Sequence, residues 1–305
     1  MGLLATLEDM ISAGFSGRGF PHGHRGRTLA LLADFSGAHR CALYSTYAFL
    51  LLDMDRNQQW LADQRAFRQQ FLLDGRRLSF KALNDRNRRA AMPQFLNMAG
   101  DIEGALVVFA IDKSHASLFQ PFAADADLSA LGPWKPSVHE HLMRVTHLSA
   151  LCLAAFSRPH QDVLWVCDQD DIASNDNQII ALTPVVAQVT AAMLRHPMGH
   201  IKVGNTGSDD GSLALEDLTA IPDLLAGAVC EGLSLMRRQN RLPVQGLQIA
   251  MPVGLSTKSG ALLAWMSQEQ RSLRTQLIAI DATAAGRSMA RHMKLAPLPR
   301  FIRQV

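Results

Sequence analysis

Three aspartates in this chain of 305 residues could do chemistry, because each follows a short apolar run. The runs are residues 28–33, 105–111 and 162–167, and the aspartates that follow them are Asp34, Asp112 and Asp168. Apolar runs of this length are typical of buried strands, so all three carboxylates are expected at strand ends.

Carboxylates that converge at strand ends indicate a metal site. Buried like charges cannot all ionise within a few ångströms of one another unless a cation offsets them. Ligands that are all oxygen favour Mg²⁺ or Mn²⁺, and two such ions could activate water against a phosphodiester. A single aspartate at a strand end is more often a loop residue or a helix cap, and that alternative remains open for each of them.

The pattern of elements predicts an α/β fold. Strands are also expected at 41–52, 78–83 and 200–203, and helices at 60–72, 86–98, 138–156, 177–194, 213–237 and 271–294. The run 41–52 is expected to pair with 28–33 as a hairpin, and the segment 113–137 is expected to be a loop or an insertion. Alternation of strands and helices implies a sheet whose ligands gather at the carboxyl ends of its strands.

Charge divides the chain unevenly, although the formal net charge is only +3. Residues 162–223 carry a net charge of −8, and the chain after Glu231 carries +9. We therefore expect an N-terminal helix and basic glycine-rich loop (1–27), a core (28–238) and a basic C-terminal extension packed on the core (239–305). An acidic centre beside a basic tail suits a metal site next to a phosphate-binding surface, although solvated helix faces give the same pattern.

Four segments resemble one family. They are LLADFSG at 31–37, RLSFKALND at 77–85, LWVCDQDD at 164–171 and AIPDLLAGAV at 220–229. In order and spacing they are similar to an uncharacterised RNase H-like family whose first strand runs into Asp-Glu-Ser-Gly. The resemblance implies an RNase H-like mixed sheet flanked by helices. It also gives Asp34, Asp168 and Asp223 the roles of the family's acids and singles out Lys81.

The chain departs from the family at Phe35, where the family usually has Glu. The replacement ligand is left open among Asp112, Asp170, Asp171, Glu216 and Asp217. Pro222 leaves a second question open. If the last helix runs unbroken, Glu216 and Asp223 share a face and Asp217 is turned away. If a helix begins at Pro222 instead, Asp223 lies in a first turn, where a negative charge is favoured for structural reasons alone.

The expected function is a metal-dependent nuclease, or another nucleic-acid phosphodiester hydrolase, with Asp34, Asp168 and Asp223 as catalytic residues and Asp112 as a further metal ligand. Backbone phosphates of DNA or RNA are expected to contact Lys81, Arg86, Arg237, Arg287 and Arg291. The alternative is a non-catalytic RNase H-like protein that binds nucleic acid or serves as a scaffold. The context of the family also suggests a homo-oligomer or a subunit of a larger assembly, such as a mobile-element or phage-defence system.

Composition and missing motifs narrow the choice further. A hydrophobic content of 48% and a charged content of 19% predict a globular chain. Its apolar runs are shorter than the about 20 residues that cross a bilayer, and no leader is recognised, so a cytosolic protein without membrane contact is expected. His139 and His147 share a helical face and offer only a weak metal-ligand option. The four cysteines show no paired spacing, and no serine-hydrolase elbow is present.

Overall fold

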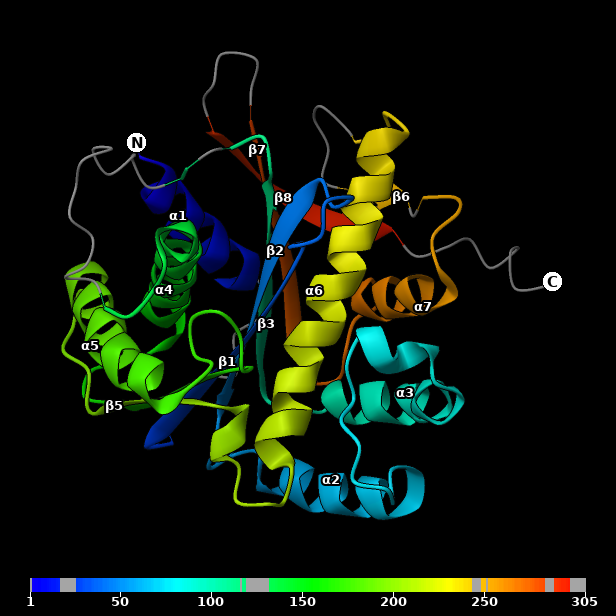
Figure 1. Ribbon diagram of the computed structural model, residues 1–305, viewed down its shortest axis with the longest axis horizontal. Helices are drawn as coiled ribbons and strands as arrows, with labels where there is room; N and C mark the ends of the chain where they lie inside the picture. The colour runs from blue at the N-terminus through cyan, green and yellow to red at the C-terminus, as the bar shows by residue number, and fades with distance from the viewer. Residues whose placement is uncertain are drawn as a thin grey trace.

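One mixed sheet forms the centre of the protein. The computed structural model describes residues 2–16, 26–115, 117–118, 132–242, 248–250, 252–282 and 288–296. Eight strands lie in the order β5-β4-β1-β2-β3-β7-β8-β6 (Figure 1). Their bounds are β1 Thr28–Ser36, β2 Tyr44–Asp53, β3 Gly104–Asp112, β4 Asp162–Cys167, β5 Ile201–Asn205, β6 Gln248–Ala250, β7 Arg274–Ala282 and β8 Ser288–Ala296. The fold is therefore α/β, as predicted.

Antiparallel and parallel pairings meet at β1. Strands β1, β2 and β3 pair antiparallel in succession, whereas β4 lies parallel to β1 and β5 parallel to β4. The predicted hairpin of β1 and β2 is thus confirmed. Gly37 follows β1 with a φ of +104°, and a Cβ there would lie 2.3 Å from the Tyr44 carbonyl oxygen. Only glycine fits this turn.

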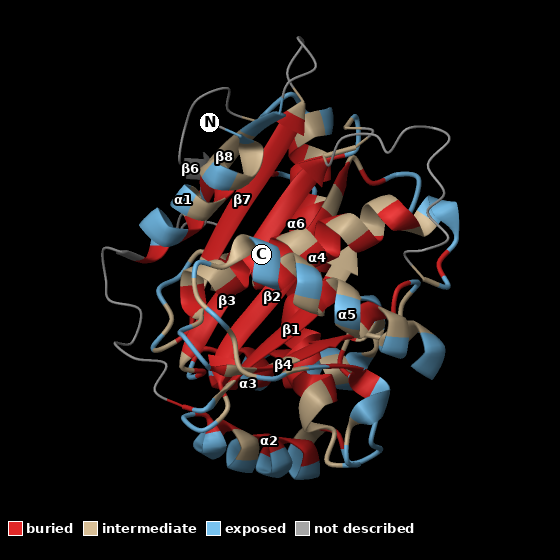
Figure 2. Cartoon of the chain, turned by 90° about the vertical axis from the view of Figure 1, so that its left-hand side faces the viewer, coloured by how far each residue is buried: buried red, intermediate tan, exposed pale blue. Residues whose placement is uncertain are grey.

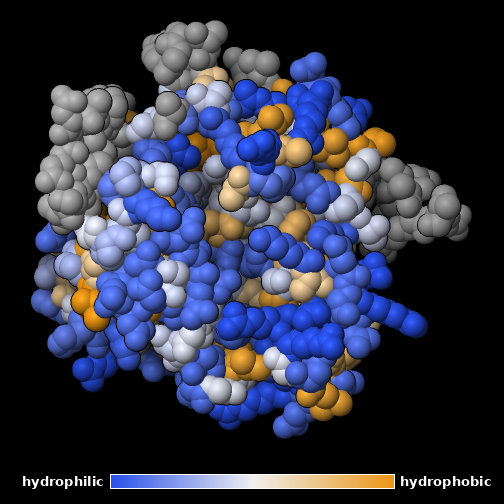
Figure 3. Space-filling model, in the orientation of Figure 1, coloured by the Kyte–Doolittle hydropathy of each residue, from blue (hydrophilic) through white to orange (hydrophobic). Residues whose placement is uncertain are grey.

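Helices cover both faces of the sheet. Helices α1 (Leu3–Ser16), α4 (Pro136–Phe156) and α5 (Asp176–Met193) lie on one face (Figure 1). The opposite face carries α2 (Gln58–Phe71), α3 (Arg86–Ala99), α6 (Ala214–Arg238) and α7 (Thr257–Met266). The central strands are buried along most of their length (Figure 2). In the view of Figure 3 most of the surface is hydrophilic, with apolar residues in separate small groups.

Helix α6 runs through Pro222 without a break. Proline removes one backbone hydrogen bond inside a helix, but α6 packs on β1 and β2 with most of its residues buried, and this burial offsets the loss. Of the two alternatives that Pro222 left open, the structure has the unbroken helix. Within the described chain α6 alone has the length and hydropathy of a membrane span, and 83% of its apolar window is buried in the fold.

Two predicted elements are wrong. Residues 78–83 do not form a strand, because Ser79 starts a turn in which its carbonyl and hydroxyl oxygens both accept from the Ala82 amide, and the 3-10 helix η1 (Lys81–Asn84) follows. The predicted basic helix at 271–294 is instead the strand pair β7 and β8. Strand β7 pairs with β3 at one edge and with β8 at the other, and its alternate residues are buried in the apolar clusters on the two faces of the sheet. The C-terminal extension therefore continues the sheet of the core.

Candidate functional site

Asp34 lies near the carboxyl end of β1 and is only 8% exposed. Its neighbours Leu32 and Ala30 belong to the apolar cluster under α6, and alternation along the strand turns Asp34 to the same face. One Asp34 carboxylate oxygen accepts a hydrogen bond of 2.6 Å from the backbone amide of Phe35. No arginine or lysine of the described chain forms an ion pair with it, so a buried carboxylate remains without a cationic partner.

Asp168 follows β4, the parallel neighbour of β1. Ala33 of β1 pairs with Cys167 of β4. Asp34 and Asp168 are the residues that follow this pair, so both lie at the same edge of the sheet. The Asp168 carboxylate accepts 2.8 Å hydrogen bonds from the Thr206 hydroxyl and from the Gln169 amide. Its side chain is 46% exposed, so it stands on the open side of the pair.

Asp223 approaches from α6. Its carboxylate accepts a 2.5 Å hydrogen bond from the backbone amide of Phe80. Phe80 can lie this close because α6 has a glycine opposite it: a Cβ on Gly227 would lie 2.3 Å from the Phe80 ring. The Lys258 ammonium group donates to the Phe80 carbonyl oxygen at 2.9 Å and lies 4.2 Å from the centre of the ring. Segments from three parts of the chain therefore position Asp223.

The three carboxylates are near enough to act on one another. Burial raises the pKa of Asp34 well above its ordinary range, and the charges of Asp223 and Asp168 raise it further. Burial likewise raises the pKa of Asp223 to about 6, against the lowering effects of the Phe80 amide, Lys81 and Lys258. The structure thus brings together the three aspartates that the resemblance singled out.

The remaining acids named from the sequence have other partners. Asp112 lies at the end of β3 and forms an ion pair with Arg237, so it is neutralised away from Asp34. Asp217 is fully buried and accepts from Arg68 and Gln64. The structure therefore separates Asp112 from the acid cluster, and Asp217 points away from it as expected.

Asp170 is the candidate for a fourth acid near Asp34. Its charge contributes to the raised pKa of Asp34, and its carboxylate lies 3.5 Å from the His141 ring. Glu216 forms an ion pair with Arg77 at 2.7 Å, and the Arg77 guanidinium also lies 3.8 Å from the Asp168 carboxylate. Asp171 is exposed.

Of the basic residues predicted to contact phosphates, some are exposed near the acids and others are held in ion pairs within the fold. Lys81 and Arg86 are exposed, and Lys81 is close enough to lower the pKa of Asp223. Arg237 and Arg291 are instead held by Asp112 and Asp281 within the fold. Arg287 and residues 17–25 of the glycine-rich loop lie outside the described residues.

Sequence reasoning missed two basic residues beside the acids. Arg77 bridges Asp168 and Glu216, and Lys258 reaches Phe80 from α7. Arg77 opens the segment RLSFKALND, so its place four residues before Lys81 was an available signal. No signal near Lys258 connects it to a site 35 residues earlier in the chain, because the contact depends on how α7 packs on α6.

Within the described chain, the acidic, histidine and cysteine side chains form no group of three that could hold a metal ion as they stand. The chemistry of the donors nevertheless fits a hard cation: three carboxylates, no sulfur, and a buried member whose charge lacks a cationic partner. Ligation of a metal would require side chains to move. Asp168 is the most exposed of the three and has the most freedom to do so.

Comparison with models of known protein families and with curated proteins found no match.

Proposed function

We propose that this protein is a metal-dependent nuclease with an RNase H-like fold, in which Asp34, Asp168 and Asp223 form the catalytic site. One observation carries the proposal: Asp34 is buried, has no cationic partner in the described chain, and faces two further carboxylates from a neighbouring strand and a helix. Such an arrangement is costly for folding alone and becomes favourable when a cation binds.

The fold supports the proposal. A mixed sheet flanked by helices is compatible with an RNase H-like fold. The resemblance implies one acid on the first strand, one on a later strand and one on the closing helix. Asp34 lies on β1, Asp168 follows β4 and Asp223 lies on α6, which α7 follows in the chain.

Asp34, Asp168 and Asp223 would hold the metal. Mg²⁺ or Mn²⁺, when bound, supplies Lewis-acid stabilisation of charge on a phosphodiester oxygen. The residues of the chain orient the ligands: the amides of Phe35 and Phe80 each fix one carboxylate oxygen, and the Thr206 hydroxyl fixes one of Asp168. The Phe80 ring packs against Gly227, one turn along α6 from Asp223.

Basic groups on the open side of the acids favour a phosphate substrate. Arg77 is 52% exposed beside Asp168, and Lys81 is exposed beside Asp223. Both cations can approach backbone phosphates of DNA or RNA, and such contacts give affinity without sequence preference. The proposed substrate is therefore a nucleic acid.

The direct test is cleavage of labelled RNA and DNA by the pure protein in Mn²⁺, Mg²⁺ or EDTA. Cleavage in metal and none in EDTA is expected. Asp34→Asn should lower the rate by about a hundredfold or more, because it removes a charge that acts in the transition state. Asp63→Asn is the matched control, since Asp63 is an exposed aspartate on α2 whose carboxylate accepts from Gln59, and it should keep full activity. Lack of cleavage by wild type, or equal cleavage by Asp34→Asn, would contradict the proposal.

A second candidate is a non-catalytic RNase H-like protein that binds nucleic acid or serves as a scaffold in an assembly. Phe35 favours it, since the family usually has Glu there, and its ring packs between Tyr47 and His141, with ring centres 5.6 and 5.0 Å away. Calorimetry with Mn²⁺ separates the two candidates. Salt-sensitive binding of nucleic acid without any binding of Mn²⁺ would favour the scaffold, and light scattering would show whether the protein self-associates.

A further inference from the structure

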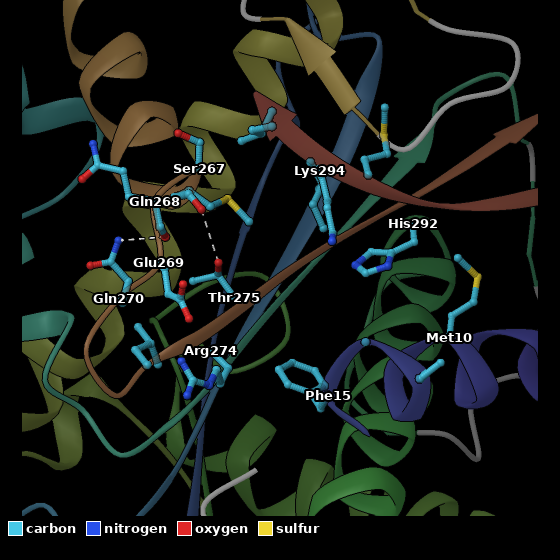
Figure 4. Close-up of a pocket in the computed structure, with 17 residues that line it drawn as sticks. Met10, Phe15, Ser267, Gln268, Glu269, Gln270, Arg274, Thr275, His292 and Lys294 are labelled. Carbon is cyan, nitrogen blue, oxygen red and sulfur yellow. Dashed lines mark hydrogen bonds between the residues drawn. The ribbon is translucent and has the colours of Figure 1, made fainter. Parts of the chain in front are cut away.

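A pocket of about 810 Å³ lies beyond β7, away from the acids. It is enclosed by the end of α1, the loop after α7 and the strands β7 and β8 (Figure 4). Two strands separate β7 from β1, and neighbouring strands lie about 4.8 Å apart, so the pocket is at least about 14 Å from Asp34. Its volume is that of a small-molecule site.

The pocket exists because β8 leaves β7. Pairing between them ends at Leu277 and Met293, and β8 then pairs with β6 through Lys294 and Leu295. Residues 274–276 of β7 are consequently paired with β3 on one side and have no β8 partner on the other. The divergence of the two strands opens a space that is part of the fold rather than a gap between mobile side chains.

Basic side chains from both strands line this space. Arg274 begins β7, and His292 and Lys294 project together from β8 into the pocket (Figure 4). None of the three has an ion-pair or hydrogen-bond partner among the described residues, in contrast to Arg291, which is held by Asp281. Burial and the charge of Lys294 lower the pKa of His292. Glu269 is the only acid among the described lining residues, so the pocket is complementary to an anion.

The other walls are apolar and soft. They include Met10 and Phe15 of α1, Met266 of α7 and Met293 of β8. Thioethers adapt their shape and make favourable contacts with aromatic rings. A wall of this kind suits a planar ring, and the basic side suits a phosphate, for which arginine and lysine supply charge-assisted hydrogen bonds.

We propose that this pocket binds an organic phosphate with a planar ring, of the mononucleotide class, with Lys294 on the phosphate, Arg274 adding positive charge from the other end of the pocket, and Phe15 and the methionines against the ring. The site is separate from the proposed nuclease site and does not depend on it.

AMP and CMP are the probes, titrated into the full chain by calorimetry in EDTA. Saturable binding is expected, weaker for inorganic phosphate and for adenosine, because each has only half of the complementary groups. Lys294→Gln and the double variant Arg274→Gln/Lys294→Gln should weaken nucleotide binding, the double variant by about tenfold or more. Lys202→Gln is the matched control: it removes an exposed lysine from β5, at the opposite edge of the sheet, and should leave binding unchanged.

Asp34→Asn distinguishes this site from the acid site. Its binding of AMP should equal that of wild type even if its nuclease activity is lost. Absence of nucleotide binding by the folded wild type would overturn the proposal. The proposal would also be overturned if Lys294→Gln and the double variant both bound AMP as tightly as wild type does. Loss of AMP binding in Asp34→Asn, or binding of inorganic phosphate as tight as that of AMP, would overturn it too. Circular dichroism of each variant verifies that it is folded, and Lys294 is exposed, so its single variant keeps the test independent of folding.

Discussion

Helix α6 carries two aspartates six residues apart whose surroundings are opposite. Asp217 is fully buried and accepts two hydrogen bonds from Arg68, at 2.6 and 2.8 Å, and one from Gln64. Asp223 accepts one backbone amide and faces the carboxylates of Asp34 and Asp168. The same helix therefore holds one carboxylate whose charge is neutralised by an arginine and one whose charge is repelled by neighbouring carboxylates.

This difference separates structural acids from candidate ligands. Burial raises the pKa of both aspartates, but for Asp217 the guanidinium of Arg68 counters it, as Arg237 does for Asp112. A neutralised carboxylate contributes to the fold and leaves little for a ligand. A carboxylate beside others of its kind destabilises the fold until a cation arrives.

Removal of the structural acid should have the largest effect on stability. Asp217→Ala leaves Arg68 buried without its partner, which typically costs about 3–5 kcal/mol in the free energy of unfolding. Denaturation in urea measures this. The double variant Asp217→Leu/Arg68→Leu should recover most of the loss, since it leaves no buried charge. A cost below about 1 kcal/mol for Asp217→Ala would remove the contrast between the two aspartates.

Removal of the Asp223 charge should have the reverse effect and stabilise the folded protein. The pKa of Asp223 is about 6 in the folded protein, raised from 3.8, so its contribution to stability is complete below about pH 4 and is lost as the pH rises through 6. Two pKa units correspond to about 3 kcal/mol. Asp223→Asn should therefore be more stable than wild type at pH 8 in EDTA, by up to about 3 kcal/mol, and equal to it at pH 4. Thermal unfolding across this range gives the sign, and lower stability of the variant at pH 8 would contradict it.

Disturbing the contact behind Asp223 should cost less. Gly227→Ala places a methyl group against the Phe80 ring, and overpacking of this kind costs about 1–3 kcal/mol. Gly260→Ala in α7 is the matched control, because a Cβ there meets nothing within 4 Å, so this substitution should stabilise the helix slightly. Equal unfolding free energies for the two variants would show that Phe80 is not held against α6.

The smallest effect is expected from Lys258→Gln. The variant loses a cation that lowers the pKa of Asp223, so that pKa should rise while stability changes by less than about 1.5 kcal/mol. Titration of the Asp223 carboxyl signal by NMR measures the shift. Lys202→Gln on β5 should leave the pKa of Asp223 unchanged.

Much of the fold could be predicted from the sequence, because hydrophobic periodicity indicated its regular parts. The strand at 162–167 was placed at its observed bounds, and the long helix ending near Arg237 was found as well. Errors arose where local pattern and tertiary context disagree. The segment 271–294 has spacing that suits a helix, but its central residues pair with β3 and β8, which no local pattern reveals.

The candidate site divides along the same line. Asp34 and Asp168 were predictable because a strand end is a local feature, and parallel pairing brings neighbouring ends together. The same reasoning was wrong for Asp112, because its partner Arg237 comes from the far end of α6. Neither Lys258 nor the pocket between β7 and β8 has a local signature, because both arise from contacts between distant segments.

The place of β7 beside β3 has a consequence for how the chain reaches its native state. Ala105 pairs with Arg274, so the edge of the buried strand β3 stays open until residues about 170 positions further along the chain have been synthesised. Such long-range pairing slows folding and exposes apolar edges during it. A chain truncated after α6 should therefore aggregate on expression rather than fold as a smaller unit, and synthesis at reduced temperature should increase the soluble yield of the full chain.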